Sequence, residues 1–314
     1  MKFKSIGKLF GTGIILIILS GCGGGGGSSP IDSVITDPIA PTDPTTPTGK
    51  VIDGPVQGLN YICSSGSTGI TNINGEYTCK EGDTVEFTVG SVPLGTVTTK
   101  DEITTPYSFF ANEVDPAINV ARLLQSIDSD GIYGGDIIIN QDLASLLPSD
   151  LDFTSPTFEN DVETALNITL VSAMAAQIEM NGAILNAGGT IPVPYINHVT
   201  DSLGNVQTNS FAVEGHGQWP EGIVTPMVVN VGDVITFTVD ATEPEGGTLE
   251  YKFVTPSGTT QDWSTSNTFT WTVGASDFGP MKIVYIAVRN TDGRDYMGEW
   301  NGDDYTYATY DVSD

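Results

Sequence analysis

Two stretches of the chain alternate apolar and polar residues with the two-residue period of a β-strand, GDTVEFTV at 82–89 and GDVITFTV at 232–239. In the first, Val85, Phe87 and Val89 fall on one face and polar residues on the other, as in a half-buried sheet. An internal repeat could explain the similarity of the two stretches. The residues on either side differ, however, which favours a turn followed by a strand that arose independently in both places. Because 37 glycines and many Thr, Val and Ile residues accompany such stretches, the sequence predicts a mainly β fold.

The second of these stretches begins a series of strands. Alternation predicts one apolar face in each of four strands, formed by Ile235, Phe237 and Val239, by Leu249, Tyr251 and Phe253, by Phe269, Trp271 and Val273, and by Ile283, Tyr285 and Ala287. Turn residues punctuate the strands at the spacing of a sandwich. In the earlier part, Asn74-Gly75 predicts a tight hairpin and Asp53-Gly54-Pro55 a turn.

Helical periodicity interrupts the strands in three places, one of which is FENDVETAL at 158–166. Pro116 is expected to open a helix whose apolar stripe includes Ile118, Ala121 and Leu124, with Arg122 solvated or locally paired. A third helix is expected where Met174, Ile178 and Leu185 recur at helical spacing, packing on the sheet.

The first 21 residues have the layout of a bacterial export signal. Lys2, Lys4 and Lys8 precede an apolar run at 13–19, which is too short to span a bilayer as a helix. Residues 22–49 are rich in Gly, Ser, Pro and Thr and contain almost nothing to bury, so we expect a tether without a packed core. Beyond it we expect a β-rich module with helices at 50–187, a connection or added hairpin at 188–220, and a β-sandwich at 221–314.

The end of the signal, Leu19-Ser20-Gly21-Cys22, resembles the lipobox of bacterial lipoproteins. The resemblance implies that Cys22 carries fatty acyl chains such as palmitate, that the mature chain begins there, and that it is anchored to the membrane. An ordinary secretory signal with an incidental cysteine is the alternative. Gly23 stands where the enterobacterial rule places aspartate for inner-membrane retention, so the resemblance implies the outer membrane, with cell surface or periplasmic face undecided.

Charge narrows the range of partners. Without the three lysines of the signal, eight basic residues face 39 acidic ones, a net charge of −31. Nucleic acid is therefore excluded as an expected partner, because binding phosphates requires a basic surface. Abundant carboxylates are available for divalent cations.

Cys63 and Cys79 remain as a pair once Cys22 is acylated, and we expect a disulfide in an oxidising compartment. Metal or redox chemistry is the alternative, but no Cys-x-x-Cys spacing or neighbouring histidine supports it.

Both modules resemble known ones. The first resembles a module of proteobacterial lipoproteins and surface proteins, with strands similar to carboxypeptidase-regulatory, transthyretin-like domains, through residues 51–56, 61–63, 75–79, 82–85, 94–95, 119–125 and 128–131. It implies a surface-associated setting without an established activity. The second resembles PKD-like and other immunoglobulin-like modules through residues 232–233, 240–247, 249–253, 262–264 and 270–272, which implies an immunoglobulin-like β-sandwich.

Two acidic stretches are candidate sites. Asp128, Asp130 and Asp136 resemble the opening of a calcium loop, although the twelfth position is Ile139 rather than a bidentate Glu; a plain Asp-Gly turn is the alternative. Near the end, acids lie among aromatic residues and could bind sugar or calcium, or they could flank a final strand packed through Tyr305 and Tyr307. This stretch comprises Asp292, Asp295, Tyr296, Glu299, Trp300, Asp303, Asp304, Tyr305, Tyr307 and Tyr310. His198 and His216 are expected to be ordinary loop histidines.

No motif of a known catalytic class is present: Gly-x-Ser-x-Gly, His-Glu-x-x-His and the phosphate loop are all missing. We therefore expect no enzyme, but a lipid-anchored envelope protein with a non-catalytic binding or adhesive role toward a glycan or surface protein. A structural or accessory subunit is the second hypothesis. A glycan hydrolase using paired carboxylates is the third.

Overall fold

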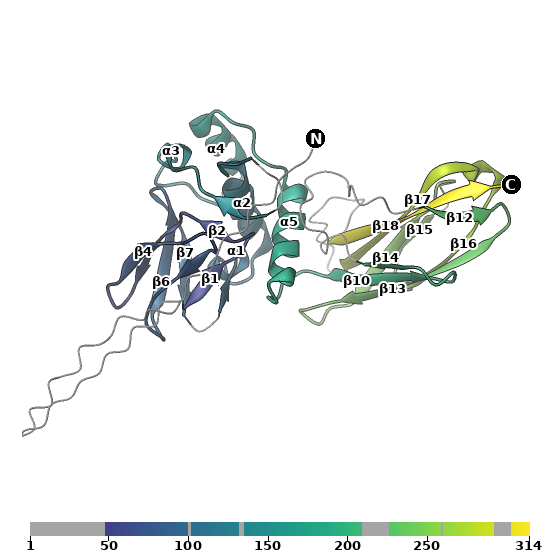
Figure 1. The fold of residues 1–314 in the computed structure, drawn as a ribbon, viewed down its shortest axis with the longest axis horizontal. Helices are drawn as coiled ribbons and strands as arrows, with labels where there is room; N and C mark the ends of the chain where they lie inside the picture. The colour runs from purple at the N-terminus through teal and green to yellow at the C-terminus, as the bar shows by residue number, and fades with distance from the viewer. Residues whose placement is uncertain (1–47, 100–101, 132–134, 209–225, 259, 292–302) are drawn as a thin grey trace, which may run out of the picture. The chain divides into compact units, whose positions relative to one another are not determined.

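The computed structural model describes residues 48–99, 102–131, 135–208, 226–258, 260–291 and 303–314. Strands take up 41% and helices 20% of the structure, which confirms the prediction of a mainly β fold. Figure 1 shows strands mixed with helices up to α5, and strands from β10 onward. None of the described helices has the length and apolar character needed to cross a membrane.

The first module contains three small sheets. Their strands are β1 (Gly49–Val51), β2 (Val56–Gln57), β3 (Asn60–Cys63), β4 (Thr68–Ile70), β5 (Glu76–Tyr77), β6 (Thr84–Val89), β7 (Val92–Thr98), β8 (Ile103–Thr104) and β9 (Ile137–Ile138). The sheets have the orders β4-β3-β6-β7, β5-β1-β8 and β2-β9. In β6 the predicted alternation is confirmed, since Val85, Phe87 and Val89 are fully buried while Thr84 and Glu86 are exposed.

Five helices of this module are described, and they pack around the strands. They are α1 (Pro106–Phe109), α2 (Val114–Ser126), α3 (Gln141–Ala144), α4 (Phe158–Leu166) and α5 (Ala173–Asn186). The apolar stripe of α2 is confirmed, because Ile118, Ala121 and Leu124 are buried. The helix begins two residues before Pro116, which the first turn tolerates because its backbone N–H groups lack acceptors within the helix.

The helix predicted from Met174, Ile178 and Leu185 is α5, and Leu185 packs partly buried against the core, but these residues do not form its buried side. Ala176, Met180 and Ile184 form its buried apolar face, whereas Met174 is 37% exposed. Apolar residues surround most of this helix, so their spacing alone did not select the buried side. Ser172 caps the first turn through a hydrogen bond from the Ala175 N–H.

Arg122 is buried rather than solvated, and its local pairing is one hydrogen bond from its Nη1 to Asn119 Oδ1 at 3.4 Å. Its side chain is 9% exposed, its Nε donates to the Val171 carbonyl at 2.8 Å, and its guanidinium lies 2.9 Å from Glu159. Arg122 therefore ties α2 to α4 and to the segment that leads into α5.

The Asn74-Gly75 step makes a turn but not the predicted hairpin. The Gly75 N–H donates to the Asn72 carbonyl at 2.8 Å, yet β4 pairs with β3 and β5 pairs with β1. The chain leaves one sheet at this turn and enters another. A Cβ at Gly75 would lie 2.5 Å from the Val51 carbonyl oxygen, so glycine is required by close backbone approach as well as by its φ of +71°.

The second module is a β-sandwich. Its strands are β10 (Tyr195–Asp201), β11 (Val206–Thr208), β12 (Met227–Asn230), β13 (Val234–Thr242), β14 (Leu249–Val254), β15 (Thr260–Ser264), β16 (Thr268–Thr272), β17 (Gly279–Asn290) and β18 (Asp304–Ser313). A four-stranded sheet of order β11-β10-β13-β16 packs on a five-stranded sheet of order β12-β18-β17-β14-β15. Both sheets contribute to one core, in which Phe237, Phe253 and Trp271 are nearly inaccessible.

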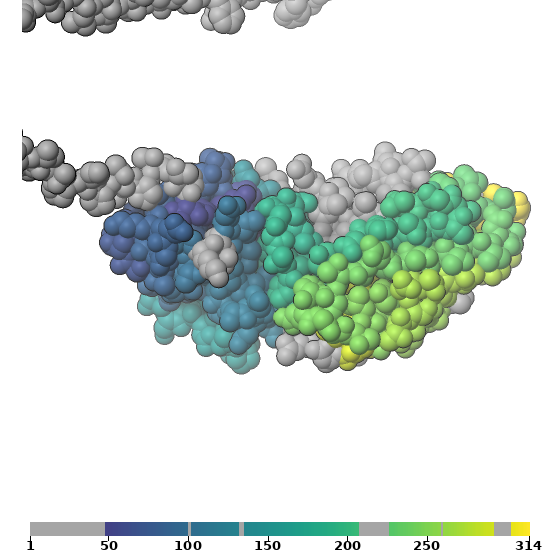
Figure 2. All heavy atoms as spheres, turned by 90° about the horizontal axis from the view of Figure 1, so that it is seen from below, coloured from purple at the N-terminus to yellow at the C-terminus, as the bar shows by residue number. Residues whose placement is uncertain are grey.

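The strand order agrees with the expected immunoglobulin-like fold. The neighbours β15, β14, β17 and β18 match strands C′, C, F and G, and the pair β13 and β16 matches B and E. In the space-filling view the described part of this module, coloured green to yellow, has a closely packed surface (Figure 2). Side chains from both sheets fill the core between them.

Part of the stretch 188–220, expected to be a connection or added hairpin, belongs to the sandwich. Strands β10 and β11 form an antiparallel hairpin, and β10 also pairs with β13 along most of its length. The four-stranded sheet thus begins at Tyr195.

In β17 the core side is not the one formed by Ile283, Tyr285 and Ala287. Val284, Ile286 and Val288 point inward and are fully buried, whereas Ile283 is 39% exposed and Tyr285 is half-buried. Both sides of this strand carry apolar residues, so the two-residue alternation did not indicate which side faces the core. An aromatic ring is consequently placed on the outer surface of the sheet.

Candidate functional site

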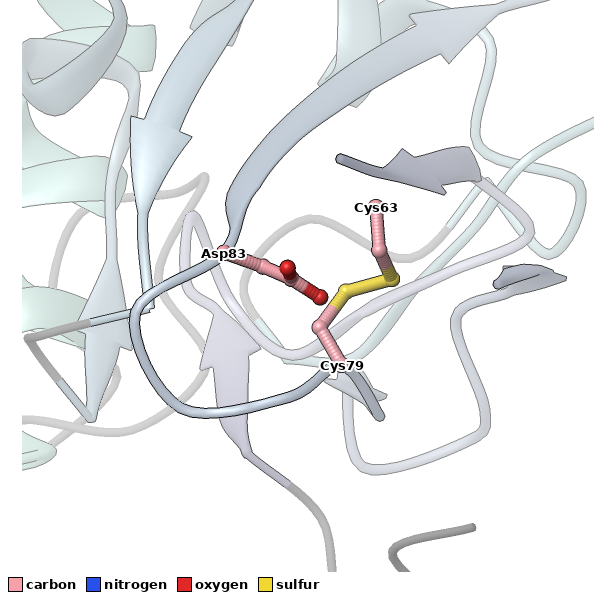
Figure 3. Close-up of side chains that lie close together, drawn as sticks. All are labelled: Cys63, Cys79 and Asp83. Carbon is pink, nitrogen blue, oxygen red and sulfur yellow. A yellow bond between two sulfur atoms is a disulfide. The ribbon is translucent and has the colours of Figure 1, made fainter. Parts of the chain in front are cut away.

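A disulfide joins Cys63 and Cys79, as predicted, and Figure 3 shows it beside Asp83. Cys63 ends β3 in the four-stranded sheet, and Cys79 follows β5 of the three-stranded sheet. Both side chains are buried, and the backbone at Cys79 is held by two hydrogen bonds with the Thr48 hydroxyl. The bond therefore staples two sheets of the first module to each other.

Asp83 organises the turn next to this disulfide. Its carboxylate accepts hydrogen bonds from the Ser65 hydroxyl at 2.6 Å, the Ser64 hydroxyl at 3.0 Å and the Lys80 N–H at 3.0 Å. These bonds, that from Ser65 foremost, hold the pKa of Asp83 below its ordinary value. The two sulfurs and an Asp83 oxygen lie within 4.8 Å of one another, a spacing that suits a metal. Because the sulfurs are bonded to each other, they are not thiolate ligands, and the cluster is a cross-link.

The three carboxylates of the calcium candidate are not gathered as a group. Asp128 accepts a hydrogen bond from the Ile138 N–H at 2.8 Å and forms a β-bridge with Ile139. Burial, and then the neighbouring Asp130, raise the pKa of Asp128. Among the described residues, Asp128, Asp130 and Asp136 do not bring ligand atoms within 4.8 Å of one another as a set. Calcium binding by this stretch stays a prediction, and residues 132–134 lie outside the described part.

Several candidates fall outside the described residues. They are Cys22, His216, Asp292, Asp295, Tyr296, Glu299 and Trp300. His198 is described and lies on β10 rather than in a loop. Its Nδ1 is 3.3 Å from the Asp240 carboxylate, with 42% and 56% of the two side chains exposed, so the pair is a surface contact across two strands.

The two acids that open β18 are buried and bind backbone. Asp303 accepts from the Asn290 N–H at 2.9 Å. Asp304 accepts from the Ile196 and Tyr305 N–H groups, each at 2.7 Å. Asp304 thus links the two sheets of the sandwich, a structural role that buried charges fill when hydrogen-bonded. Tyr310 and Val312 pack inward, while Tyr305 and Tyr307, expected to pack, lie on the outer surface.

Aromatic side chains gather on the outer surface of the five-stranded sheet. Tyr285 and Tyr305 stack with ring centroids 5.3 Å apart, and Tyr307 stands opposite Tyr285 in the strand register. All three are half-buried. Burial raises the pKa of each of the three phenols.

A tryptophan extends this surface toward the other edge of the sheet. The Trp263 ring lies 4.4 Å from the Arg289 guanidinium and 5.6 Å from the Lys252 ammonium. Arg289 is fixed by the Glu250 carboxylate, which accepts from it at 2.9 Å. Trp263, Tyr285, Tyr305 and Tyr307 are called the aromatic face below. The aromatic face consists of rings bordered by charged groups. The rings can stack on a flat apolar surface of a ligand, and the charged groups can hydrogen-bond the polar edge of that ligand.

Sequence reasoning connected Tyr305 and Tyr307 with a sugar site but missed Tyr285 and Trp263. Tyr285 was grouped with the apolar residues of its strand, and Trp263 served only as a fold signature. The outward direction of Tyr285 follows from the burial of its neighbours Val284 and Ile286, which the sequence did not reveal. Searches against protein-family models, curated proteins and solved structures found no match to this chain.

Proposed function

We propose that this chain is a non-catalytic binding protein of the bacterial envelope, held by lipid on Cys22, that binds an extended neutral glycan on the aromatic face. The observation that carries the proposal is the Tyr285–Tyr305 stack beside Tyr307 on the outer surface of the sheet. Phenol rings offer apolar surface to the C–H face of a sugar.

The rigid setting of the face supports binding rather than catalysis. Tyr285 and Tyr305 lie on strands in the interior of the sheet, and the residues before and after each of them in the strand are fully or almost fully buried. Rings fixed in this way lose little conformational freedom when a ligand binds. The rings are bordered by Glu250, Arg289 and Lys252, whose charges are compensated by ion pairs. These polar groups are therefore suited to hydrogen-bonding the polar edge of a bound sugar.

Net charge selects among glycans. The chain expected after signal cleavage carries a charge of −31, which disfavours uronic-acid and sulfated polymers through like-charge repulsion. A neutral glycan is therefore the proposed ligand. A lipid anchor with a Gly, Ser and Pro tether would let the modules reach such a polymer away from the lipid headgroups.

A binding assay tests the proposal. The chain from residue 22 with Cys22→Ser, which stays unlipidated, is run through gels containing cellulose, xylan or chitin derivatives, with polygalacturonate as the acidic comparison. Retardation by a neutral polymer and none by polygalacturonate is expected. Equal mobility in every gel would contradict the proposal.

An accessory role in an envelope complex has one observation in its favour. Val228 on β12 and Ile283 on β17 flank β18 on the same outer surface and are 70% and 39% exposed. Exposed apolar side chains of this kind suit a protein partner. Val228→Ser would leave glycan binding unchanged under the first proposal, whereas loss of co-purification of a defined envelope partner with that variant would favour the accessory role.

A further inference from the structure

We propose that Asp53 and Gln125 form an internal site for a hard cation, such as Ca²⁺, in the first module. Asp53 stands at the tip of the turn Ile52–Pro55, where Gly54 has a φ of +78°. Acids at turn tips are ordinarily solvated. Asp53 is instead 3% exposed, because its side chain enters between α2 and α5.

Hydrogen-bond geometry fixes the orientation of the Gln125 amide. Its Nε2 donates to Asp53 Oδ1 at 2.9 Å and to the Ala176 carbonyl at 3.1 Å. Two acceptors require the nitrogen at that position, so the other amide atom is the oxygen. Within the described part of the chain, Gln125 Oε1 and Asp53 Oδ2 are buried without a hydrogen-bond donor. The hydrogen-bonded pair thus presents two buried oxygens that need a positive partner.

The charges around Asp53 are unfavourable to a bare carboxylate. Its interacting charged neighbour is Glu179, on α5, which carries the same sign. Burial foremost, and Glu179 as well, raise the pKa of Asp53, while the hydrogen bond from Gln125 lowers it. None of the ion pairs found among the described residues includes Asp53. A cation would compensate the buried charge of Asp53, whereas a water molecule would supply only hydrogen bonds.

The turn that carries Asp53 lies against one backbone carbonyl oxygen. A Cβ at Gly54 would lie 2.0 Å from the carbonyl oxygen of Gly135, so the turn packs against the end of the segment that carries Asp128 and Asp130. Carboxylate, amide and backbone carbonyl oxygens are the ligands that Ca²⁺ accepts. This site differs from the calcium loop predicted from the sequence, because its central ligands are Asp53 and Gln125.

Thermal unfolding of the mature chain with Cys22→Ser tests the inference, after removal of divalent ions with EDTA and addition of CaCl₂. The parent is expected to gain about 3–8 °C in Tm at a calcium concentration well above Kd. Asp53→Asn keeps the acceptor for Gln125 but removes the charge, and its Tm should not respond. The matched control Asp152→Asn, at an exposed carboxylate, should respond like the parent. A parent without a response, or Asp53→Asn responding fully, would overturn the proposal.

A second variant covers the case in which Asp53→Asn does not fold. Gln125→Met keeps a long helix-forming side chain and removes Oε1. Calorimetric titration with CaCl₂ should show one ion per chain in the parent and roughly tenfold weaker binding in Gln125→Met, because a ligand oxygen is lost. Equal affinity in the two proteins would exclude Gln125 and with it the proposed site. The glycan assay is independent of this result.

Discussion

Tyr285 and Tyr305 stack across β17 and β18, with ring centroids 5.3 Å apart and planes inclined by 26°. They are diagonal neighbours, since Tyr285 faces Tyr307 and Tyr305 faces Ala287 in the register. A double-mutant cycle with Tyr285→Ala and Tyr305→Ala should give a coupling of about 0.5–1.5 kcal/mol in urea unfolding. Tyr285→Ala and Ile70→Ala, which alter different modules, should be additive. Additivity of the tyrosine pair itself would show that the stack contributes nothing.

Removing the disulfide should destabilise the first module. Cys63 and Cys79 are 16 residues apart, and closure of such a loop stabilises by about 3 kcal/mol in the chain-entropy model. Cys63→Ser should lower the unfolding midpoint by the corresponding amount. The parent treated with a dithiol reductant is the matched control and should approach the variant. The contrary result is an unchanged unfolding midpoint of the reduced parent while Cys63→Ser unfolds earlier. The loss of stability would then arise from the packing of the serine side chain and not from the missing disulfide.

The Asp83 carboxylate should make the free energy of unfolding depend on pH. Its pKa is lowered in the folded state, so its contribution is fully present above the pKa of the unfolded chain and is lost as pH falls through the lower, folded value. Asp83→Asn should be less stable than the parent at pH 7, and the difference should shrink below about pH 4. Glu81→Gln, an exposed neighbour, serves as the control and should track the parent. A stability difference between parent and Asp83→Asn that stays constant from pH 2 to pH 7 would refute this explanation.

Cys22 should decide membrane attachment. In the organism that makes the protein, Cys22→Ser is expected to move it from the membrane fraction to the soluble envelope fraction, because no acyl chain is then attached. Metabolic labelling with a palmitate analogue should mark the parent and not the variant. Retention of Cys22→Ser in washed membranes would show that another element holds the chain there.

The sequence predicted the buried residues correctly in those strands and helices that have one polar and one apolar face. The alternation in β6 and in β13 gave the buried residues Phe87 and Phe237 correctly. The paired cysteines gave the disulfide. These features depend on local period and on a simple count, so neighbouring strands had little influence on them.

The errors occurred where both faces are apolar or where partners are distant in sequence. In β17 and α5 the period gave no preference, and the buried side was decided by packing. Arg122 was expected at the surface because its partner Glu159 is not within reach along the helix. For the same reason the Asp53–Gln125 bond, which spans 72 residues of sequence, had no local signal. The aromatic face depended on the direction of β17 and was therefore only partly foreseen.

Calorimetric titration with neutral hexasaccharides measures glycan binding by the aromatic face. The mature chain with Cys22→Ser is titrated with cellohexaose, xylohexaose and chitohexaose, beside the Tyr285→Ala/Tyr305→Ala double variant and the control Ile70→Ala. The proposal predicts that one neutral hexasaccharide binds the parent and the control equally, and that the double variant binds it at least roughly tenfold more weakly while remaining folded. Equal affinity of the folded double variant, or no heat with any of the three sugars, would contradict the proposal.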